Sequence, residues 1–252
     1  MKGLPYTVAE MWKLAELCRY NKHDSGDGDD DLTDYISDHV EARYPDSVFL
    51  EMQNVIEYMY ILDKPDKLVF TFRGTDGMKA WLNNFKIIPN QLGAHSGFYD
   101  LFSYFALEIA RYIKNNYDGK KPVYCTGHSL GGAMAQFAYW YLQTRFNIVS
   151  TCINFGSSVC GNAEFEAEID KCSGLNLRVV NNWDLVTRLD FGIGKHAGSE
   201  MQIGTKPFYR RIFPFTIIDH HYYFYTKSLM RYYKAYGIDK MLKPVLKRSK
   251  WL

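Results

Sequence analysis

The chain lacks long apolar runs and a strong excess of either charge. No stretch reaches the roughly 18 consecutive apolar residues of a membrane-spanning helix, and residues 1–18 lack the apolar core of a signal peptide. Lys and Arg number 30 against 28 Asp and Glu, a formal net charge of +2, so the composition carries no signature of nucleic-acid binding. We expect a protein without a membrane span and without a nucleic-acid partner.

Cysteine is scarce and scattered. The five cysteines are an odd number, and none of them form a C-x-x-C pair or a zinc-ligand spacing. The acidic loop at 24–31 alternates Asp as a calcium loop does, but Leu32 and Asp38 stand where that loop needs Gly and Glu. We therefore expect reduced thiols, an intracellular, cytoplasmic location, and neither a metal nor an organic cofactor.

The chain does contain enough apolar material for one large core. It has 252 residues, 47% of them hydrophobic, with 19 Gly and 8 Pro, and α/β folds of this size often form one unit. Strands alternate with helices along the chain, which favours an α/β fold with a mostly parallel central sheet flanked by helices. We predict a single domain over 1–252, with an N-terminal helical extension at about 1–46 and a basic C-terminal tail at about 238–252.

Apolar periodicity places the elements of this fold. A period of 3.6 residues predicts helices, whereas alternation or a short buried run predicts strands. The expected strands are 47–53, 55–62, 67–72, 123–126, 148–155 and 175–181, with a two-stranded hairpin at 199–213. The expected helices are 7–22, about 32–41, 98–117, 161–172 and 221–236, with a further helix after the turn at 127–131.

Strand, sharp turn and helix follow one another around Gly127-His128-Ser129-Leu130-Gly131. This is the G-x-S-x-G pattern that holds a nucleophilic serine above a sheet edge. So tight a turn forces the serine into a strained backbone conformation, and larger neighbours than glycine would collide with the strand or the helix. A serine that merely caps the helix is the alternative, but a cap needs no flanking glycines. Ser129 is therefore the candidate nucleophile.

A serine nucleophile needs a base, and the base needs an acid that orients it. With this kind of turn, the acid is expected further along the chain at the end of a strand, and the histidine after it. Asp184 follows the predicted strand 175–181 and fits best. Its rivals are Asp170, in a predicted helix, and Asp190, several residues beyond the strand.

Three histidines follow Asp184. His196 lies in a glycine-rich loop, and His220 and His221 lie at a junction between a loop and a helix. The residues alone do not choose between the last two. His128, beside the nucleophile, is expected to point away from it.

Positively charged residues are concentrated near the C-terminus. From 206 to 252, eleven Lys and Arg stand against two acidic residues. Apolar residues interleaved with the basic ones would let the tail lie on an anionic membrane surface, although Pro244 interrupts the helix that this needs. A solvated terminal tail is the simpler alternative.

Six short motifs follow one another between residues 70 and 224: FRGT (72–75), AHSGF (94–98), TGHSLGGA (126–133), NFGSSVCGN (154–162), RVVNNWDLVTRLD (178–190) and DHHYYF (219–224). Together they resemble the class 3, fungal-type triacylglycerol lipase family. The resemblance implies an α/β-hydrolase fold and a catalytic triad of Ser129, Asp184 and His220, because the family histidine directly follows an aspartate. It also implies oxyanion-binding N–H groups at Thr75 and Leu130.

Family members carry a lid between the oxyanion loop and the next helix. Here that segment is short, and its candidate lid and substrate contacts are Met78, Trp81, Leu82 and Phe85. An ordinary surface helix, buried on one face, is an equal alternative. Two family patterns are missing, since Asn84 stands where an Asp is common and Ser158 where a Pro is common.

The resemblance implies a serine ester hydrolase that acts as a lipase on acyl glycerols through an acyl-enzyme. A phospholipase or a small-ester carboxylesterase would use the same triad with another pocket. A non-catalytic, lipase-like interaction protein is the alternative of a different class, although such a protein would usually have lost a triad member. The expected partners are a lipid or ester substrate and, peripherally, a membrane or lipid-droplet surface, with no obligate protein partner.

Overall fold

The computed structural model describes residues 3–18, 46, 48–53, 58–74, 88–182, 184–188, 196–204, 217–238 and 240. These residues form a seven-stranded sheet whose strands lie in chain order. The strands are β1 (Val48–Gln53), β2 (Tyr58–Asp63), β3 (Leu68–Phe72), β4 (Val123–His128), β5 (Ser150–Phe155), β6 (Asn176–Asn181) and β7 (Ser199–Ile203). The first three pair antiparallel, and β3 to β7 run parallel. The predicted mostly parallel sheet is therefore confirmed.

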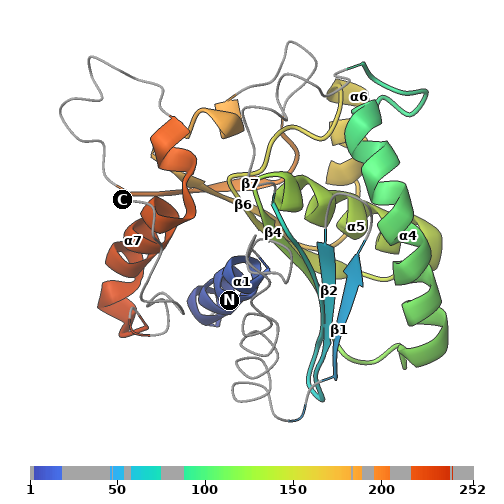
Figure 1. The fold of residues 1–252 in the computed structure, drawn as a ribbon, viewed down its shortest axis with the longest axis horizontal. Coiled ribbons are helices and arrows are strands. Elements are labelled where there is room, and N and C mark those ends of the chain that lie inside the picture. Colours follow the sequence, from blue (N-terminus) through green and yellow to red (C-terminus); the bar gives the residue numbers. More distant parts are fainter. Residues whose placement is uncertain are drawn as a thin grey trace, which may run out of the picture.

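Helices cover both faces of the sheet. The α-helices are α1 (Leu4–Leu17), α4 (Ser96–Asn116), α5 (Leu130–Phe146), α6 (Ala163–Asp170) and α7 (Tyr222–Tyr233), and short 3-10 turns are η1 (Val186–Arg188), η3 (Ile217–His220) and η4 (Lys234–Tyr236). Figure 1 shows α1 and α7 on one side of the sheet and α4 and α5 on the other. The α/β-hydrolase arrangement that the sequence predicts is present.

Alternation along the strands divides the apolar residues between the two faces. In β3, Leu68 and Phe70 join the cluster that contains α4 and α5, whereas Val69 joins the cluster around α1 and α7. In β5, Cys152 and Ile153 divide in the same way. Successive side chains of a strand point to opposite faces, so each strand serves both cores. Cys125 and Cys152 are buried core residues, and all five cysteines are free thiols.

α1 is buried more deeply than its amphipathic pattern predicts. The helix contacts β3, β4, β5 and α7. Two of its three charged residues, Lys13 and Glu16, are each only 1% exposed and form an ion pair of 2.8 Å. The indole of Trp12 is fully buried and donates a hydrogen bond to Thr226 Oγ1 over 3.0 Å. The helix is thus a packed layer of the fold and not an appendage to it.

Several predicted segments lie outside the described residues. They are the helix near 32–41, the second strand of the 199–213 hairpin, all but Ile88 of the candidate lid segment 78–88, and all but Ile238 and Lys240 of the basic tail at about 238–252. The first strand of that hairpin is described as β7, and it pairs in parallel with β6 at the edge of the sheet.

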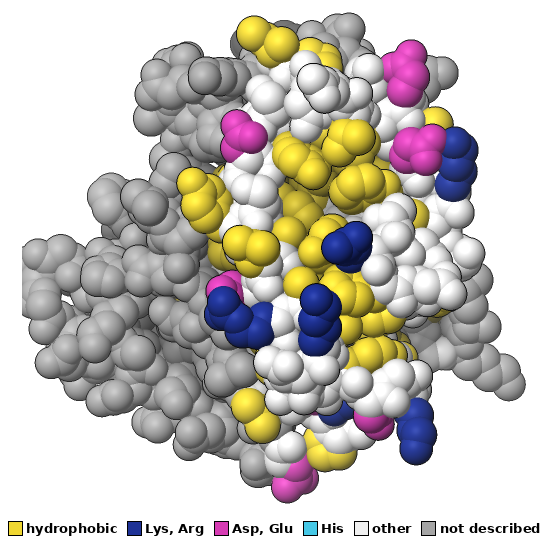
Figure 2. All heavy atoms as spheres, turned by 90° about the vertical axis from the view of Figure 1, so that its right-hand side faces the viewer, with side chains coloured by type: hydrophobic (Ala, Val, Ile, Leu, Met, Phe, Trp, Pro, Cys, Tyr) yellow, Lys and Arg dark blue, Asp and Glu magenta, His cyan; other side chains and the backbone are white. Residues whose placement is uncertain are grey.

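The outer side of α4 carries apolar side chains to the surface. Tyr104 and Leu107 are 60% and 68% exposed on α4, and Figure 2 shows apolar side chains gathered on this face of the molecule. Among the described helices, none combines the length and the hydropathy needed to cross a membrane.

Candidate active site

The turn between β4 and α5 holds Ser129 in a strained conformation. Its φ and ψ are 59° and −125°, a region that non-glycine residues rarely adopt. A Cβ atom at Gly127 would lie 2.3 Å from the carbonyl oxygen of Gly131, and one at Gly131 would lie 2.2 Å from that of Phe72. Neither position therefore admits a side chain. The structure thus has the strained serine that the sequence predicts, and it requires glycine at both flanking positions.

The loop after β3 packs against this turn. A Cβ atom at Gly74 would lie 2.4 Å from the carbonyl oxygen of His128 and 3.3 Å from Ser129 Cβ. Leu130 is the first residue of α5, and the first N–H groups of a helix have no acceptor within it. The loop and the helix start thus meet beside Ser129, where an oxyanion would need donors. Thr75, the second predicted donor, lies outside the described residues.

Asp184 and His220 meet at the same edge of the sheet. Asp184 lies in the turn after β6, and His220 ends the 3-10 turn η3. His220 Nδ1 lies 2.9 Å and 2.8 Å from the two carboxylate oxygens of Asp184. Asp184 is fully buried, and the backbone N–H of Val186 donates to its Oδ1 over 2.9 Å. The structure therefore brings together the predicted acid and one of the three candidate histidines.

The contact with Asp184 assigns the tautomer of His220. An ionised carboxylate only accepts hydrogen bonds, so Nδ1 must carry the proton and the neutral ring then has its lone pair on Nε2. That atom is buried and has no hydrogen-bond partner within the described part of the chain. His220 is thus oriented as a base whose accepting nitrogen is unoccupied.

Ser129 and His220 both lie at the end of β5. The N–H of Ser129 donates to the carbonyl oxygen of Phe155 over 2.9 Å, and a Cβ atom on the next residue, Gly156, would lie 3.1 Å from His220 Cε1. Among the described atoms, Ser129 Oγ makes no hydrogen bond to His220 Nε2. In enzymes without substrate this contact is often longer than a hydrogen bond and tightens on binding.

Tyr225 is a part of the site that sequence reasoning missed. Its hydroxyl donates to Asp184 Oδ2 over 2.7 Å and accepts from the backbone N–H of Asn181 over 3.2 Å. Burial, together with the negative charge of Asp184, raises the pKa of Tyr225 well above its ordinary value, so the hydroxyl stays protonated as a donor. A run of tyrosines follows His220, and nothing in that run distinguishes this one.

Gly156 was also missed. It has φ of 60°, and a Cβ atom there would lie 2.9 Å from the Tyr225 hydroxyl and 3.0 Å from Asp184 Oδ2. The sequence does show a glycine directly after a predicted buried strand. Its contacts could not be predicted, because they are made with α7 and with the turn after β6, which are distant in the chain.

The rival residues have other roles. Asp170 is the last residue of α6 and accepts from the N–H of Gly198 over 2.7 Å. His196 Nε2 lies 2.8 Å from the carbonyl oxygen of Thr187, and His221 caps α7 by accepting from the N–H of Tyr223. Asp190 and the candidate lid residues lie outside the described residues. His128 faces His220, with its Nε2 2.9 Å from that residue's carbonyl oxygen.

The site holds no arrangement typical of a metal centre. Among the described side chains, no three of His, Cys, Asp or Glu lie close enough to share a metal ion. Asp184 is instead surrounded by hydrogen-bond donors, namely His220 Nδ1, the Tyr225 hydroxyl and the N–H of Val186. Such a set of donors fixes the orientation of the carboxylate beside the imidazole.

The fold resembles that of fungal lipases of known structure. The triacylglyceride lipase of Rhizomucor miehei superposes with a TM-score of 0.69 at 18% identity, over 87% of this chain and 94% of that one. The lipase of Rhizopus microsporus var. chinensis superposes with a TM-score of 0.68 at 20% identity, over 85% of this chain and 86% of that one. At such identities the similarity establishes the fold.

Sequence comparison finds similar lipases and phospholipases. A phospholipase A(1) of Arabidopsis thaliana, DAD1, is 32% identical over 148 residues, which are 48% of this chain and 33% of that protein. A secreted mono- and diacylglycerol lipase of Fusarium solani is 30% identical over 135 residues, which are 49% of this chain and 39% of that protein. The aligned parts thus span less than half of these relatives. Residues 69–192 match the family model of class 3 lipases, so this region of the chain is similar to the class 3 lipases.

Proposed function

We propose that this chain is a serine hydrolase that cleaves carboxylic esters, with acyl glycerols as the substrate class. The observation that carries the proposal is the 2.8 Å contact between His220 Nδ1 and Asp184 at the sheet edge where a strained turn presents Ser129. A buried imidazole with its accepting nitrogen unoccupied, at the same sheet edge as a strained serine, is the arrangement that acyl transfer requires.

The residues act in a defined order. His220 Nε2 takes the proton of Ser129 as Oγ bonds to the ester carbonyl carbon, and the resulting imidazolium is stabilised by Asp184. The tetrahedral intermediate places its oxyanion near the N–H of Leu130, with Thr75 as the proposed second donor. The C–O bond of the leaving alcohol breaks as His220 returns the proton to it. Water, activated by the same histidine, then releases the acid from Ser129.

The relatives leave two lipid classes open. One is named as a phospholipase A(1) and another as a mono- and diacylglycerol lipase, and both reactions cleave a carboxylic ester at a glycerol carbon. The chemistry of the site is the same for both, so the choice between them depends on the pocket. We propose acyl glycerols first, with phospholipids as the second candidate.

The first experiment is hydrolysis of p-nitrophenyl esters from acetyl to palmitoyl, followed by diacylglycerol and phosphatidylcholine. Ser129→Ala and His220→Ala should each reduce turnover by about 10,000-fold, and a fluorophosphonate should label the wild type but not Ser129→Ala. His221→Ala is the matched control, because this histidine caps α7 and should leave turnover within about twofold.

The chain length of the best ester then separates a lipase from a small-ester esterase, and the two glycerolipids separate lipase from phospholipase. A folded wild type that hydrolyses none of these esters and takes up no fluorophosphonate would contradict the proposal. It would favour a non-catalytic binding protein on the same fold.

We also propose a peripheral contact with a lipid surface. Lys227, Arg231 and Lys234 are exposed on α7 and η4, and Tyr232 is 46% exposed among them. The acidic residue described in this segment, Asp219, is buried. Cations interspersed with tyrosine suit an anionic membrane interface. Removal of residues 241–252 should weaken binding to phosphatidylserine vesicles without changing turnover of a soluble ester.

An intracellular location is the corresponding proposal for the compartment. All five cysteines are free thiols, and all but Cys172 are buried, which suits a reducing environment. Fractionation of cells that produce the full-length protein would test it, and recovery in the secreted fraction would contradict it.

A further inference from the structure

The segment that carries His220 is too short to hold itself in place. η3 covers only Ile217–His220, and α7 begins two residues later at Tyr222. A single 3-10 turn has poor hydrogen-bond geometry and little stability of its own. The position of the His220 imidazole must therefore come from contacts with the sheet beneath it.

Two successive carbonyl groups of this segment accept hydrogen bonds from buried side chains. Asn181 Nδ2 donates to the carbonyl oxygen of Asp219 over 2.9 Å, and His128 Nε2 lies 2.9 Å from that of His220. A carbonyl oxygen only accepts, so Nε2 of His128 carries the proton. Asn181 ends β6 and His128 ends β4, the two strands on either side of β5.

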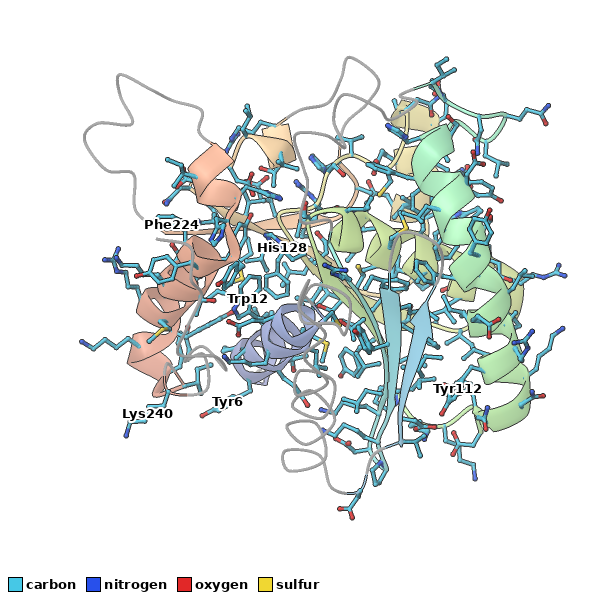
Figure 3. All side chains as sticks on the ribbon, viewed as in Figure 1. Tyr6, Trp12, Tyr112, His128, Phe224 and Lys240 are labelled. Carbon is cyan, nitrogen blue, oxygen red and sulfur yellow. The ribbon has the colours of Figure 1, made fainter. Side chains whose placement is uncertain are left out.

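Both donors are themselves fixed by packing. Asn181 is fully buried, and its backbone N–H donates to the Tyr225 hydroxyl. The ring of His128 packs edge-on against Trp12 at 5.8 Å and against Tyr225 at 5.3 Å. It lies over the ring of His220 with 4.7 Å between centroids. Figure 3 shows Trp12 and His128 next to each other in the interior, on the side of the sheet that α1 covers.

We infer that His128 and Asn181 are positioning residues that fix the peptide carrying His220, so that its Nε2 faces Ser129. The inference rests on the proposed function, since it assigns a role within that reaction. His220 is held at its side chain by Asp184 and at its backbone by these two donors. Loss of either donor frees the backbone while the contact with Asp184 remains, and the ring can then tilt away from Ser129.

Such a role predicts a particular kinetic signature. A misplaced base slows proton transfer, so kcat should fall, whereas substrate binding does not need the base and KM should not change. If the two residues only stabilised the fold, their loss would lower the midpoint of thermal unfolding without lowering kcat at constant KM. The two roles are therefore separable by experiment.

The variants His128→Phe and Asn181→Leu remove the donors while keeping side-chain volume. His128→Gln restores an amide N–H near the position of Nε2. The matched control is Tyr139→Phe, because the buried Tyr139 hydroxyl also donates to backbone carbonyls, those of Gly174 at 2.7 Å and Cys172 at 3.0 Å. Tyr139 lies ten residues beyond Ser129, in the interior of α5.

On a soluble p-nitrophenyl ester, His128→Phe and Asn181→Leu should each lose about 10- to 100-fold in kcat, with KM within about twofold. His128→Gln should recover most of the loss, and Tyr139→Phe should keep the wild-type kcat at a comparable loss of thermal midpoint. If kcat of the two donor variants matches that of Tyr139→Phe, the inference is overturned and the two residues only stabilise the fold.

A second readout keeps the inference testable if the wild type proves inactive. The Nδ1 proton of His220, hydrogen-bonded to Asp184, should give a low-field resonance in the proton NMR spectrum. His128→Phe and Asn181→Leu should broaden or shift this resonance, and Tyr139→Phe should not. An unchanged resonance in both donor variants would refute the positioning role, whatever the activity of the wild type.

Discussion

At the scale of single residues, the site depends on side chains and backbone atoms that are packed without spare room. Gly156 combines a left-handed backbone with contacts to Tyr225, Asp184 and His220. Tyr225 joins two of these parts, since its hydroxyl contacts both Asp184 and the backbone of Asn181. Small changes here should therefore affect both catalysis and stability.

Gly156→Ala should reduce kcat/KM by about 100-fold, because the new methyl group would lie about 3 Å from Asp184 and His220 and displace them. Gly119→Ala is the control: its φ is 77°, but nothing lies within 4 Å of the added atom. Both substitutions should lower the free energy of unfolding by about 1–3 kcal/mol through backbone strain. Equal effects of the two on ester turnover would show that strain, and not crowding, matters at Gly156.

Tyr225→Phe should lower kcat about tenfold, since Asp184 loses a donor and holds the imidazole less firmly. The loss of a hydrogen bond to a charged group should also reduce the free energy of unfolding by about 1.5–3 kcal/mol. Tyr233→Phe serves for comparison, because the hydrogen bond of that hydroxyl within the described residues is to the sulfur of Met201 at 3.7 Å. Kinetics and urea unfolding of both variants check the expectation, which fails if their kcat values agree.

At the scale of elements, α6 ties together two loops beside the sheet through Glu166. Its Oε1 accepts from the N–H groups of Cys160 and Gly161 at 2.6 Å and 3.1 Å, and its Oε2 accepts from that of Ala197 at 2.8 Å. Burial raises the pKa of Glu166 from 4.5 to about 7. The carboxylate therefore titrates near neutral pH in the folded protein.

This shift predicts how stability depends on pH. Between pH 4.5 and about 7 the folded state binds more protons at Glu166 than the unfolded state does, so stability falls as pH rises through this range. The contribution is full below pH 4.5, is lost above about 7, and amounts to about 3 kcal/mol at most. Glu166→Gln should remove this slope in urea unfolding. A variant with the same slope as the wild type would contradict the assignment to Glu166.

At the scale of the whole molecule, the site depends on segments outside the matched family region 69–192. α1 and α7 both lie beyond it, and they pack together on one face of the sheet. Trp12 connects them, since it stacks on Tyr225 at 5.6 Å and bonds to Thr226. We propose that the chain folds as a single domain in which α1 is indispensable.

Trp12→Ala should lower the free energy of unfolding by about 3–5 kcal/mol, the usual range for a large buried aromatic residue. Tyr6→Ala, on the same helix but 53% exposed, should change it by less than about 0.5 kcal/mol. Far-ultraviolet circular dichroism and tryptophan fluorescence should report one coincident transition. Two separate transitions would contradict the single domain.

Local patterns in the sequence determine much of this molecule. The period of the apolar residues predicts α4 and the strands β1 to β6, because burial of one face imposes the same period on any helix or strand. The strained turn at Ser129 is likewise readable, since only glycine fits at positions 127 and 131. The order of residues along the chain favours Asp184 as the acid, because Asp184 comes after Ser129 and follows directly on a predicted strand.

Only the tertiary structure decided which distant side chains meet. The family resemblance already favoured His220 over His221, but the contact of His220 with Asp184 is a feature of the folded chain. The proposed roles of His128 and Asn181 depend on β4 and β6 flanking β5. The burial of α1 and the raised pKa of Glu166 depend on the elements that pack over them. Contacts between residues far apart in the chain are set by strand order and by packing of the layers, and neither leaves a periodic signal in the sequence.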